Sequence, residues 1–245
     1  FENNRLTTVQ LPSTLTTVGA YSFFGCPGKP ALGNKVEGKI AKDPSTVSVA
    51  ADANIQLIYN DGTTPASCFG FSNGTITSYN AAPADCGKDV VIPKMINGQA
   101  VTAIGPSAFA GKGLTSLKLP DGLLTVGNQS FMSNALTSLI IPDSVTTIAE
   151  HAFRLNQLTS VTFGNGLKEI KLWAFENNKI TSLTIPNSVI TIGDTAFANN
   201  QISSLHIGNG VTTIGYAAFK VNPMTSLTLG NSVTVIGNYA FENNI

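Results

Sequence analysis

The sequence predicts a repeat solenoid that is mainly β, built from short strands and turns. The prediction rests on a strict period of 22 residues, on apolar residues at fixed positions of each period, and on turn-forming residues between them. A unit of 22 residues cannot bury its own apolar side chains, but stacked units bury them against equivalent residues of their neighbours. The units follow one another without a gap and begin at Leu114, Leu136, Leu158, Ile180, Ile202 and Met224.

The apolar positions of a unit predict two short strands. In the unit that starts at Leu136, positions 4 and 6 are Leu139 and Ile141, and positions 10 and 13 are Val145 and Ile148. Alternation at positions 2 to 6 favours a strand, and a second extended stretch is expected at positions 10 to 13. Positions 3 and 5 of the first strand should then face solvent, because side chains alternate across a strand.

Two invariant positions are expected to be structural. Position 18 is always Phe, which predicts a buried column of stacked rings, and position 21 is always Asn, which predicts side chains bonded to the backbone at the bend. Between the strands, positions 7 to 9 carry turn formers such as Pro-Asp-Ser and Gly-Asn-Gly. The invariant residues are Phe131, Phe153, Phe175, Phe197, Phe219 and Phe241, and Asn134, Asn156, Asn178, Asn200, Asn222 and Asn244.

The beginning of the chain follows the same pattern and then departs from it. Residues 1–28 are interpreted as the end of a first array, with Phe23 at position 18 and a buried free Cys26 in the Asn position. Residues 29–66 do not fit the period and predict a linker or an inserted hairpin module, with strand-like runs at 46–50 and 55–59.

The remaining residues divide into a cap and a regular array. Residues 67–113 predict an N-terminal cap with an atypical first repeat, because an uncovered first coil would expose apolar side chains and strand-edge groups. Residues 114–245 form the six regular repeats. Cys68 and Cys86 could form one disulfide across the cap, although two buried thiols remain the alternative.

Composition excludes several functions. The chain has 14 Lys+Arg and 14 Asp+Glu, and its 11% of charged residues is well below an average of about 25%. No basic excess is available to neutralise phosphates, so no nucleic-acid partner is expected. No apolar run approaches about 18 residues, so this fragment is not expected to insert into a membrane. Metal-ligand spacings and a placed nucleophile are also missing, so neither a cofactor nor catalysis is expected.

The unit LTSLxIPxSVTTIGxxAFxxN resembles the Treponema-type, or BspA-like, leucine-rich repeat of bacterial surface proteins. The resemblance covers Leu6 to about Gly28 and Asp89 to Ile245, with Gly in place of Pro at Gly164, Gly208 and Gly230. It implies a right-handed solenoid, an extracellular location at a bacterial cell surface, and a role in adhesion or protein binding. The family brings no catalytic residues that could be carried over.

The candidate ligand-binding residues lie at the variable positions. Position 3 is always Ser, whereas position 5 varies and is where selection for a partner would be visible. Position 16 carries His151 and, one coil later, Trp173, which is the only Trp of the chain. Two interpretations of Trp173 remain: it contributes, beside His151, to a protein or glycan contact, or it packs against neighbouring coils. The residues at position 5 are Lys118, Ile140, Thr162, Thr184, His206 and Thr228.

Three functions are consistent with these observations. The first is a non-enzymatic module that binds a protein or glycan of a host or neighbouring cell through the solenoid surface. The second is a structural spacer, or stalk, that displays another domain. The third is an ice-binding surface, suggested by Thr pairs such as Thr146-Thr147, although Lys168, Glu169, Ile190 and Val235 interrupt the Thr rows.

Overall fold

The computed structural model describes residues 63–82 and 86–244, and the backbone of five earlier strands. The chain divides into two compact units, Phe1–Thr63 and Thr64–Ile245. The break at Thr63 lies close to residue 66, where the sequence predicted the end of the linker. The earlier strands are Thr8–Leu11 (β1), Thr17–Val18 (β2), Val36–Ile40 (β3), Ser48–Val49 (β4) and Ile55–Tyr59 (β5).

The first unit contains parallel strands where a hairpin was expected. Strand β5 has the predicted bounds, but it pairs in parallel with β3, which also pairs in parallel with β1. Strand β4 lies within the other predicted run and pairs in parallel with β2. The hairpin interpretation of 29–66 is therefore wrong, because each run pairs with an earlier strand, as in a solenoid, and not with the other run. The predictions for Phe23 and Cys26 concern residues outside the described ranges.

The second unit begins with an antiparallel pair of strands in the region where the sequence predicted a cap. A short 3-10 helix, Ala66–Cys68 (η2), leads into the antiparallel strands Phe69–Ser72 (β6) and Thr75–Tyr79 (β7). Asn73 and Gly74 between them have φ values of 48° and 77°, as a tight hairpin turn requires. The possible disulfide is confirmed: Cys68 and Cys86 are bonded. Closing a loop of this length stabilises a fold by about 3 kcal/mol.

The cap continues into the first coil through four short strands. Asp89–Val91 (β8) and Ala103–Ile104 (β11) already lie in the two strand positions of the repeat, because they pair in parallel with strands of the next coil. Between them, Met95–Ile96 (β9) and Gln99–Ala100 (β10) form a small antiparallel hairpin. Asn97 and Gly98 make its turn with positive φ, at the insertion that interrupts the repeat pattern in the sequence.

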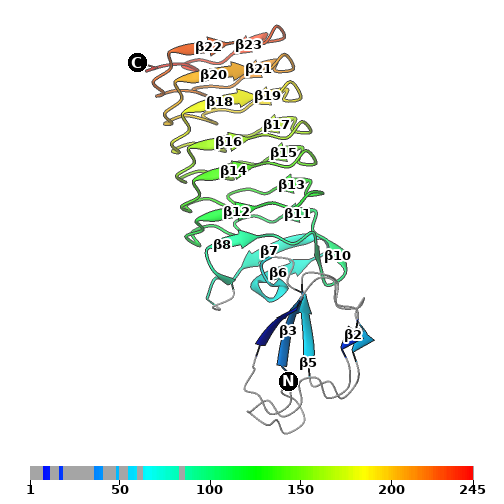
Figure 1. Cartoon of the computed structure of the whole chain (residues 1–245). Helices are drawn as coiled ribbons and strands as arrows, with labels where there is room; N and C mark the ends of the chain where they lie inside the picture. The colour runs from blue at the N-terminus through cyan, green and yellow to red at the C-terminus, as the bar shows by residue number, and fades with distance from the viewer. Residues whose placement is uncertain are drawn as a thin grey trace. The chain divides into compact units, whose positions relative to one another are not determined.

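Each regular coil contributes two strands, and Figure 1 shows the coils stacked one upon another. The first strand covers positions 3 to 5 or 6 and the second only positions 12 and 13, so both are shorter than expected. The first strands are Ser116–Lys118 (β12), Ser138–Ile140 (β14), Ser160–Thr162 (β16), Ser182–Ile185 (β18), Ser204–Ile207 (β20) and Ser226–Thr228 (β22). The second strands are Thr125–Val126 (β13), Thr147–Ile148 (β15), Glu169–Ile170 (β17), Thr191–Ile192 (β19), Thr213–Ile214 (β21) and Val235–Ile236 (β23).

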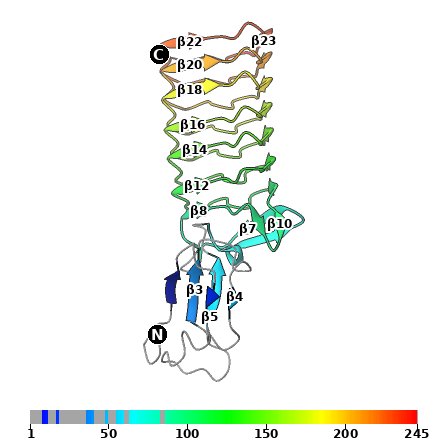
Figure 2. The ribbon, with the colours of Figure 1, turned by 45° about the vertical axis from the view of Figure 1, so that its right-hand side comes forward.

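The two rows of strands differ in continuity. The second strands form one sheet of nine strands that runs from the cap hairpin through β11 to β23, with the regular strands parallel and 22 residues apart. The first strands also lie in a row (Figure 2), but their hydrogen-bonded ladder is divided into β8–β12, β14–β16 and β18–β20–β22. The longer predicted strand is therefore in the interrupted row, and the shorter one is in the continuous sheet.

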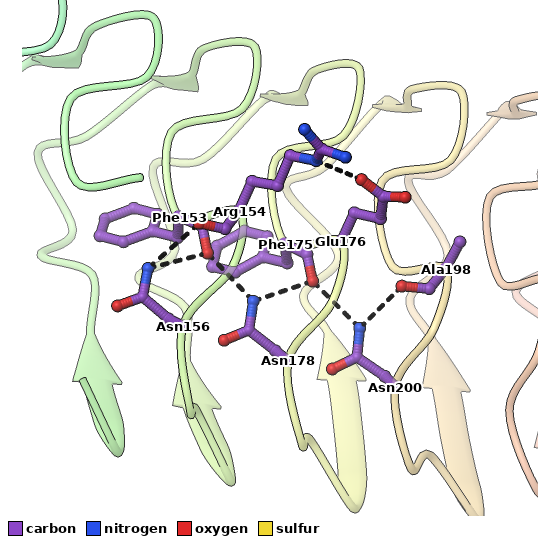
Figure 3. A network of polar contacts seen from close by, with 8 residues as sticks. All are labelled: Phe153, Arg154, Asn156, Phe175, Glu176, Asn178, Ala198 and Asn200. Carbon is purple, nitrogen blue, oxygen red and sulfur yellow. Dashed lines mark hydrogen bonds and ion pairs between the residues drawn. The ribbon is translucent and has the colours of Figure 1, made fainter. Parts of the chain in front are cut away.

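The invariant residues form the two predicted columns. Phe131, Phe153, Phe175, Phe197 and Phe219 are fully buried, and successive rings stack with centroids 5.2 to 5.4 Å apart. Figure 3 shows Asn178 and Asn200 each bonded to carbonyls of two successive coils. Asn178 Nδ2 donates to the Phe153 and Phe175 carbonyls at 3.0 and 3.1 Å, and its Oδ1 accepts from Leu158 N at 3.1 Å. Both columns are structural, as predicted.

Candidate ligand-binding surface

The predicted alternation across the first strand is present in the middle of the array. In β18, Ser182 and Thr184 are exposed while Leu183 and Ile185 are buried. The same pattern holds in β20, where His206 is exposed at position 5. Ile140 is 70% exposed, which is the highest value among the large apolar side chains of the described residues. The six predicted residues at position 5 therefore all lie on the outer side of the first-strand row.

The strand register determines which residues at position 5 are neighbours. Ile140 lies opposite Thr162, and Thr184, His206 and Thr228 follow one another across three strands. Lys118 lies opposite Val91 of the cap. The ladder is interrupted after Lys118 and again after Thr162, so the row consists of separate groups of neighbours.

A groove of about 740 Å³ opens at the second interruption, between β16 and β18. Thr162, Thr184 and His206 of the predicted row line it on the strand side. The turns at positions 7 to 9 line it on the other side through Asn165, Asn187 and Ser188, which sequence reasoning did not select. None of the lining residues is Asp, Glu, Lys or Arg, so the groove is polar without a charged side chain.

His151 and Trp173 do not join this surface. They lie at position 16, in the bend after β15 and β17, which belong to the continuous sheet. Their rings stack with centroids 4.6 Å apart, and both residues are partly exposed. Both have left-handed backbones, with φ of 56° and 54°. Hydrogen bonds from their backbone N–H groups to the next coil, to Leu172 O and Asp194 O, hold this uncommon conformation.

The environment of His151 favours the neutral imidazole. Burial lowers the pKa of His151 below its ordinary value of 6.5, and the nearby positive charge of Arg154 lowers it further, while Glu150 and Glu176 act in the opposite direction. Nδ1 is buried and has no hydrogen-bond partner among the described residues. Trp173 therefore packs against its neighbouring coil through an uncharged ring.

Acidification should protonate His151 and change the fluorescence of Trp173. Above pH 6.5, His151 is neutral in both the folded and the unfolded chain. Below pH 6.5, the unfolded chain takes up the proton first, because the pKa of His151 is lower in the folded chain. The free energy of unfolding therefore falls as the pH drops toward the pKa of His151 in the folded chain. We expect Trp173 fluorescence to change with a midpoint below pH 6.5, because a protonated imidazole quenches an adjacent indole. His151→Gln should abolish this transition and reduce the acid loss of stability.

The other histidine provides the control for that titration. His206 is exposed in β20 of the first-strand row, whereas Trp173 lies in the bend after β17 of the continuous sheet. His206→Gln should leave the fluorescence transition unchanged. A transition that persists in His151→Gln, or that lies above pH 6.5 in the wild type, would contradict the assignment.

Position 19 contributes charged contacts that the sequence analysis missed. Arg154 forms an ion pair with Glu176 in the next coil, and Lys220 forms one with Glu242 (Figure 3 shows the first). Lys220 also lies over the ring of Tyr239, with Nζ 5.7 Å from its centroid. The signal was available, since residues 22 apart at this position have opposite charges. These ion pairs connect successive coils, so the charged groups involved contribute to contacts within the array.

No groups of His, Cys, Asp and Glu that could hold a metal ion occur within residues 63–82 and 86–244. In the same ranges, the structure has no helix long and apolar enough to cross a membrane. The carboxylates named above serve in ion pairs between coils or lie beside His151, and none of them faces the groove between β16 and β18.

Most of the chain matches a known family of repeat proteins. The model of the BspA type leucine-rich repeat region matches six copies, at residues 1–29, 88–200 and 125–245. A comparison with curated proteins found no match.

Three solved structures are similar to this chain over most of its length. A leucine-rich cell surface protein from Faecalibacterium prausnitzii A2-165 has 25% identity and a TM-score of 0.60, covering 72% of this chain. This chain spans only 50% of that protein. A leucine-rich repeat protein of T. pallidum has 25% identity and a TM-score of 0.53, over 71% of this chain and 86% of its own. A leucine-rich repeat protein from Bacteroides ovatus ATCC 8483, at 22% identity and a TM-score of 0.50 over 97% of this chain and 72% of its own, shares the fold.

Proposed function

Because the chain belongs to the BspA type leucine-rich repeat family, we propose that it is a non-enzymatic binding module of a bacterial cell surface. Its partner would be a protein or glycan of a host or neighbouring cell. The observation that supports this most is the exposed row at position 5, which varies from coil to coil while its neighbour at position 3 remains Ser. The surface location is supported by the F. prausnitzii relative, which is described as a cell surface protein.

The row offers the features that a recognition surface needs. Within each group of paired strands, a parallel ladder holds the residues at position 5 in fixed register, so little conformational entropy is lost when several coils contact one partner. Ile140 provides an exposed apolar contact, and Lys118 and His206 provide polar contacts of different reach. The zero net charge gives little electrostatic steering, so affinity would come from shape and hydrogen bonds.

The triple variant Lys118→Ser, Ile140→Ser and His206→Ser tests this function. It should weaken binding of the full chain to immobilised matrix proteins, a glycan array or host cells by at least tenfold, because it removes the three side chains that differ most from the hydroxyl pattern. The array should fold normally, since all three side chains are exposed. Binding would be measured by surface plasmon resonance and folding by circular dichroism.

A matched control changes the invariant row instead. Ser116, Ser138 and Ser204 lie in the same three strands and are also exposed; replacing them by Ala should leave binding within about twofold. Unchanged binding of the folded triple variant at position 5 would exclude the strand row. It would favour the alternative function of a spacer, for which surface side chains are interchangeable and about 30 Å of stacked coils is the relevant property.

The ice-binding hypothesis finds less support in the surface chemistry. The Thr212 and Thr234 hydroxyls donate to carbonyls of the preceding coil at 3.3 and 3.2 Å, so they contribute to the stacking of coils. Glu169 and Val235 interrupt the other row of the Thr pairs, at position 12.

A further inference from the structure

The interruption of the first-strand ladder between β16 and β18 has a cause in the residue at position 7. Where a coil has Gly there, its turn can lie directly against the turn of the preceding coil. A Cβ added to Gly164 would lie 2.5 Å from Asp143 N, and one added to Gly208 would lie 2.6 Å from Asn187 N. A residue with a Cβ atom cannot approach the preceding turn this closely without a steric clash. The turns of these Gly coils therefore need glycine to pack as they do.

Pro at position 7 prevents both the close approach and a hydrogen bond. Gly208 N donates to the Ile185 carbonyl at 2.9 Å, whereas Pro186 has no N–H with which to make the equivalent bond to Phe163. Both interruptions within the regular coils come immediately before a coil with Pro at this position, Pro142 or Pro186. The ladder continues into each coil with Gly. In the first coil, which has Pro120, β12 still pairs with β8 of the cap, where Ile92 N donates to Lys118 O.

Around the second interruption, between β16 and β18, hydrogen bonds between the turns follow the same grouping. Asn165 N donates to Asp143 Oδ1, and Asn209 N donates to Asn187 Oδ1, each at 2.7 Å. Within residues 86–244, no such bond joins Asn187 to Asn165. The turns are thus bonded in groups, and the space between the group ending at Asn165 and the group starting at Asn187 is where the groove lies.

The lining of this groove has two kinds of surface. Val161, Phe163, Ile185 and Pro186 supply apolar area, and Phe163 is held edge-on against the buried rings of Phe175 and Phe197. Hydroxyl and amide groups, together with the imidazole of His206, supply the polar area. A sugar ring combines the same two properties, since its C–H face is apolar and its edge carries uncharged hydroxyl groups.

One polar atom in the groove is left without a partner. The hydroxyl of Ser188 is buried and makes no hydrogen bond among the described residues. Ser144, at the same position two coils earlier, donates to Leu123 O at 2.7 Å and accepts from Gly122 N at 3.1 Å. An unpaired buried hydroxyl is costly, and a rotation of the Ser188 side chain that brought its hydroxyl to a ligand hydroxyl in the groove would recover that energy.

We propose that the groove between β16 and β18 is a subsite for a neutral saccharide unit. The inference rests on the proposed binding function and specifies its ligand at one place in the row. The volume of about 740 Å³ lies within the range of about 300–1,000 Å³ typical of small-ligand sites. Thr184 lies centrally in the lining, with Thr162 and His206 on the neighbouring strands. The absence of Asp, Glu, Lys and Arg from the lining favours an uncharged sugar over an acidic one.

Titration of the full chain with defined oligosaccharides tests the subsite. Chitotriose, mannotriose and lactose serve as neutral probes, and sialyllactose serves as the acidic probe; amide NMR shifts locate binding and calorimetry measures Kd. We expect at least one neutral probe to shift the amides of Thr162, Thr184 and His206. Thr184→Arg should weaken its binding at least tenfold. The fold tolerates a long cation at this position, since Lys118 occupies it in the first coil.

Thr228→Arg is the matched control, because Thr228 is exposed at position 5 of β22 but does not line the groove. It should keep Kd within about twofold. The subsite is overturned if no neutral probe shifts these amides, if a matrix-protein peptide shifts them and no saccharide does, or if Thr184→Arg binds like the wild type. The proposed function is judged separately: a chain that binds cells through Lys118 and Ile140 but ignores every saccharide loses only the subsite.

Discussion

Asn178→Ala is expected to lower the free energy of unfolding by about 2 to 6 kcal/mol, since it leaves one buried N–H group without a partner, at about 1–3 kcal/mol, and removes two further hydrogen bonds, at about 0.5–1.5 kcal/mol each. The N–H is that of Leu158, and the two bonds are those to the carbonyls of Phe153 and Phe175, which keep their bonds from Asn156 and Asn200. Because these groups belong to two coils, their loss weakens the stacking as well as the bend. Urea unfolding followed by circular dichroism would measure the change.

The adjacent residue provides a control of the same type. Asn177 has a φ of 56°, is more exposed, and contributes its backbone N–H to Ala198 O. Asn177→Gly keeps that bond and suits the left-handed backbone, so the free energy of unfolding should change by less than about 0.5 kcal/mol. An equal decrease in the free energy of unfolding in Asn178→Ala and Asn177→Gly would contradict this assignment. It would show that both substitutions disturb the bend itself and that the Asn178 side chain has no special role.

Phe175→Ala is expected to cost about 3 to 5 kcal/mol, the usual range for deleting a buried ring. The Phe175 ring is fully buried and stacks on Phe153 and Phe197, at centroid distances of 5.3 and 5.2 Å, while Phe163 packs against its edge. Its removal leaves a cavity inside a column whose neighbours are fixed by their own coils, so little collapse can fill it. Thermal and urea unfolding would both report the loss.

The same substitution in the coil that begins at Met224 tests whether a ring stacked between two others contributes more to stability than a ring stacked on one. Phe241 occupies the same position but is only half-buried, and among the residues that the structure describes its ring stacks only on Phe219, at 5.6 Å. Phe241→Ala should cost less than half as much as Phe175→Ala. Equal costs would mean that the rings act individually and that the column adds nothing to the stability of the array.

The residues that repeat most strictly were the easiest to predict. Asn178 and Phe175 recur every 22 residues, and each makes the contact that its position requires. The pairing of the strands in residues 29–66 was misjudged for the opposite reason. They lack the period, and strand propensity at 55–59 shows that a strand exists but not that its partner is β3 rather than a neighbouring strand.

The candidate site was predictable only in part. Alternation in the first strand placed Thr184 and His206 on the surface, and the structure has them there. Ser188 and Asn187 were missed because turn residues look structural in a repeat. The contact between His151 and Trp173 follows from their spacing of 22 residues, but the lowered pKa of His151 depends on burial and on Arg154, which only the folded chain brings together.

The sequence by itself determined the repeating coil, its buried columns and the side of each strand that faces solvent. These follow from a period that is short, strict and local. The tertiary structure decided where the stacked strands pair and where they separate, because that depends on the distance between the backbones of successive turns. Gly at position 7 lets the turns touch, and Pro186 keeps them apart. The groove is a consequence of that difference, and it becomes visible only when two coils are placed side by side.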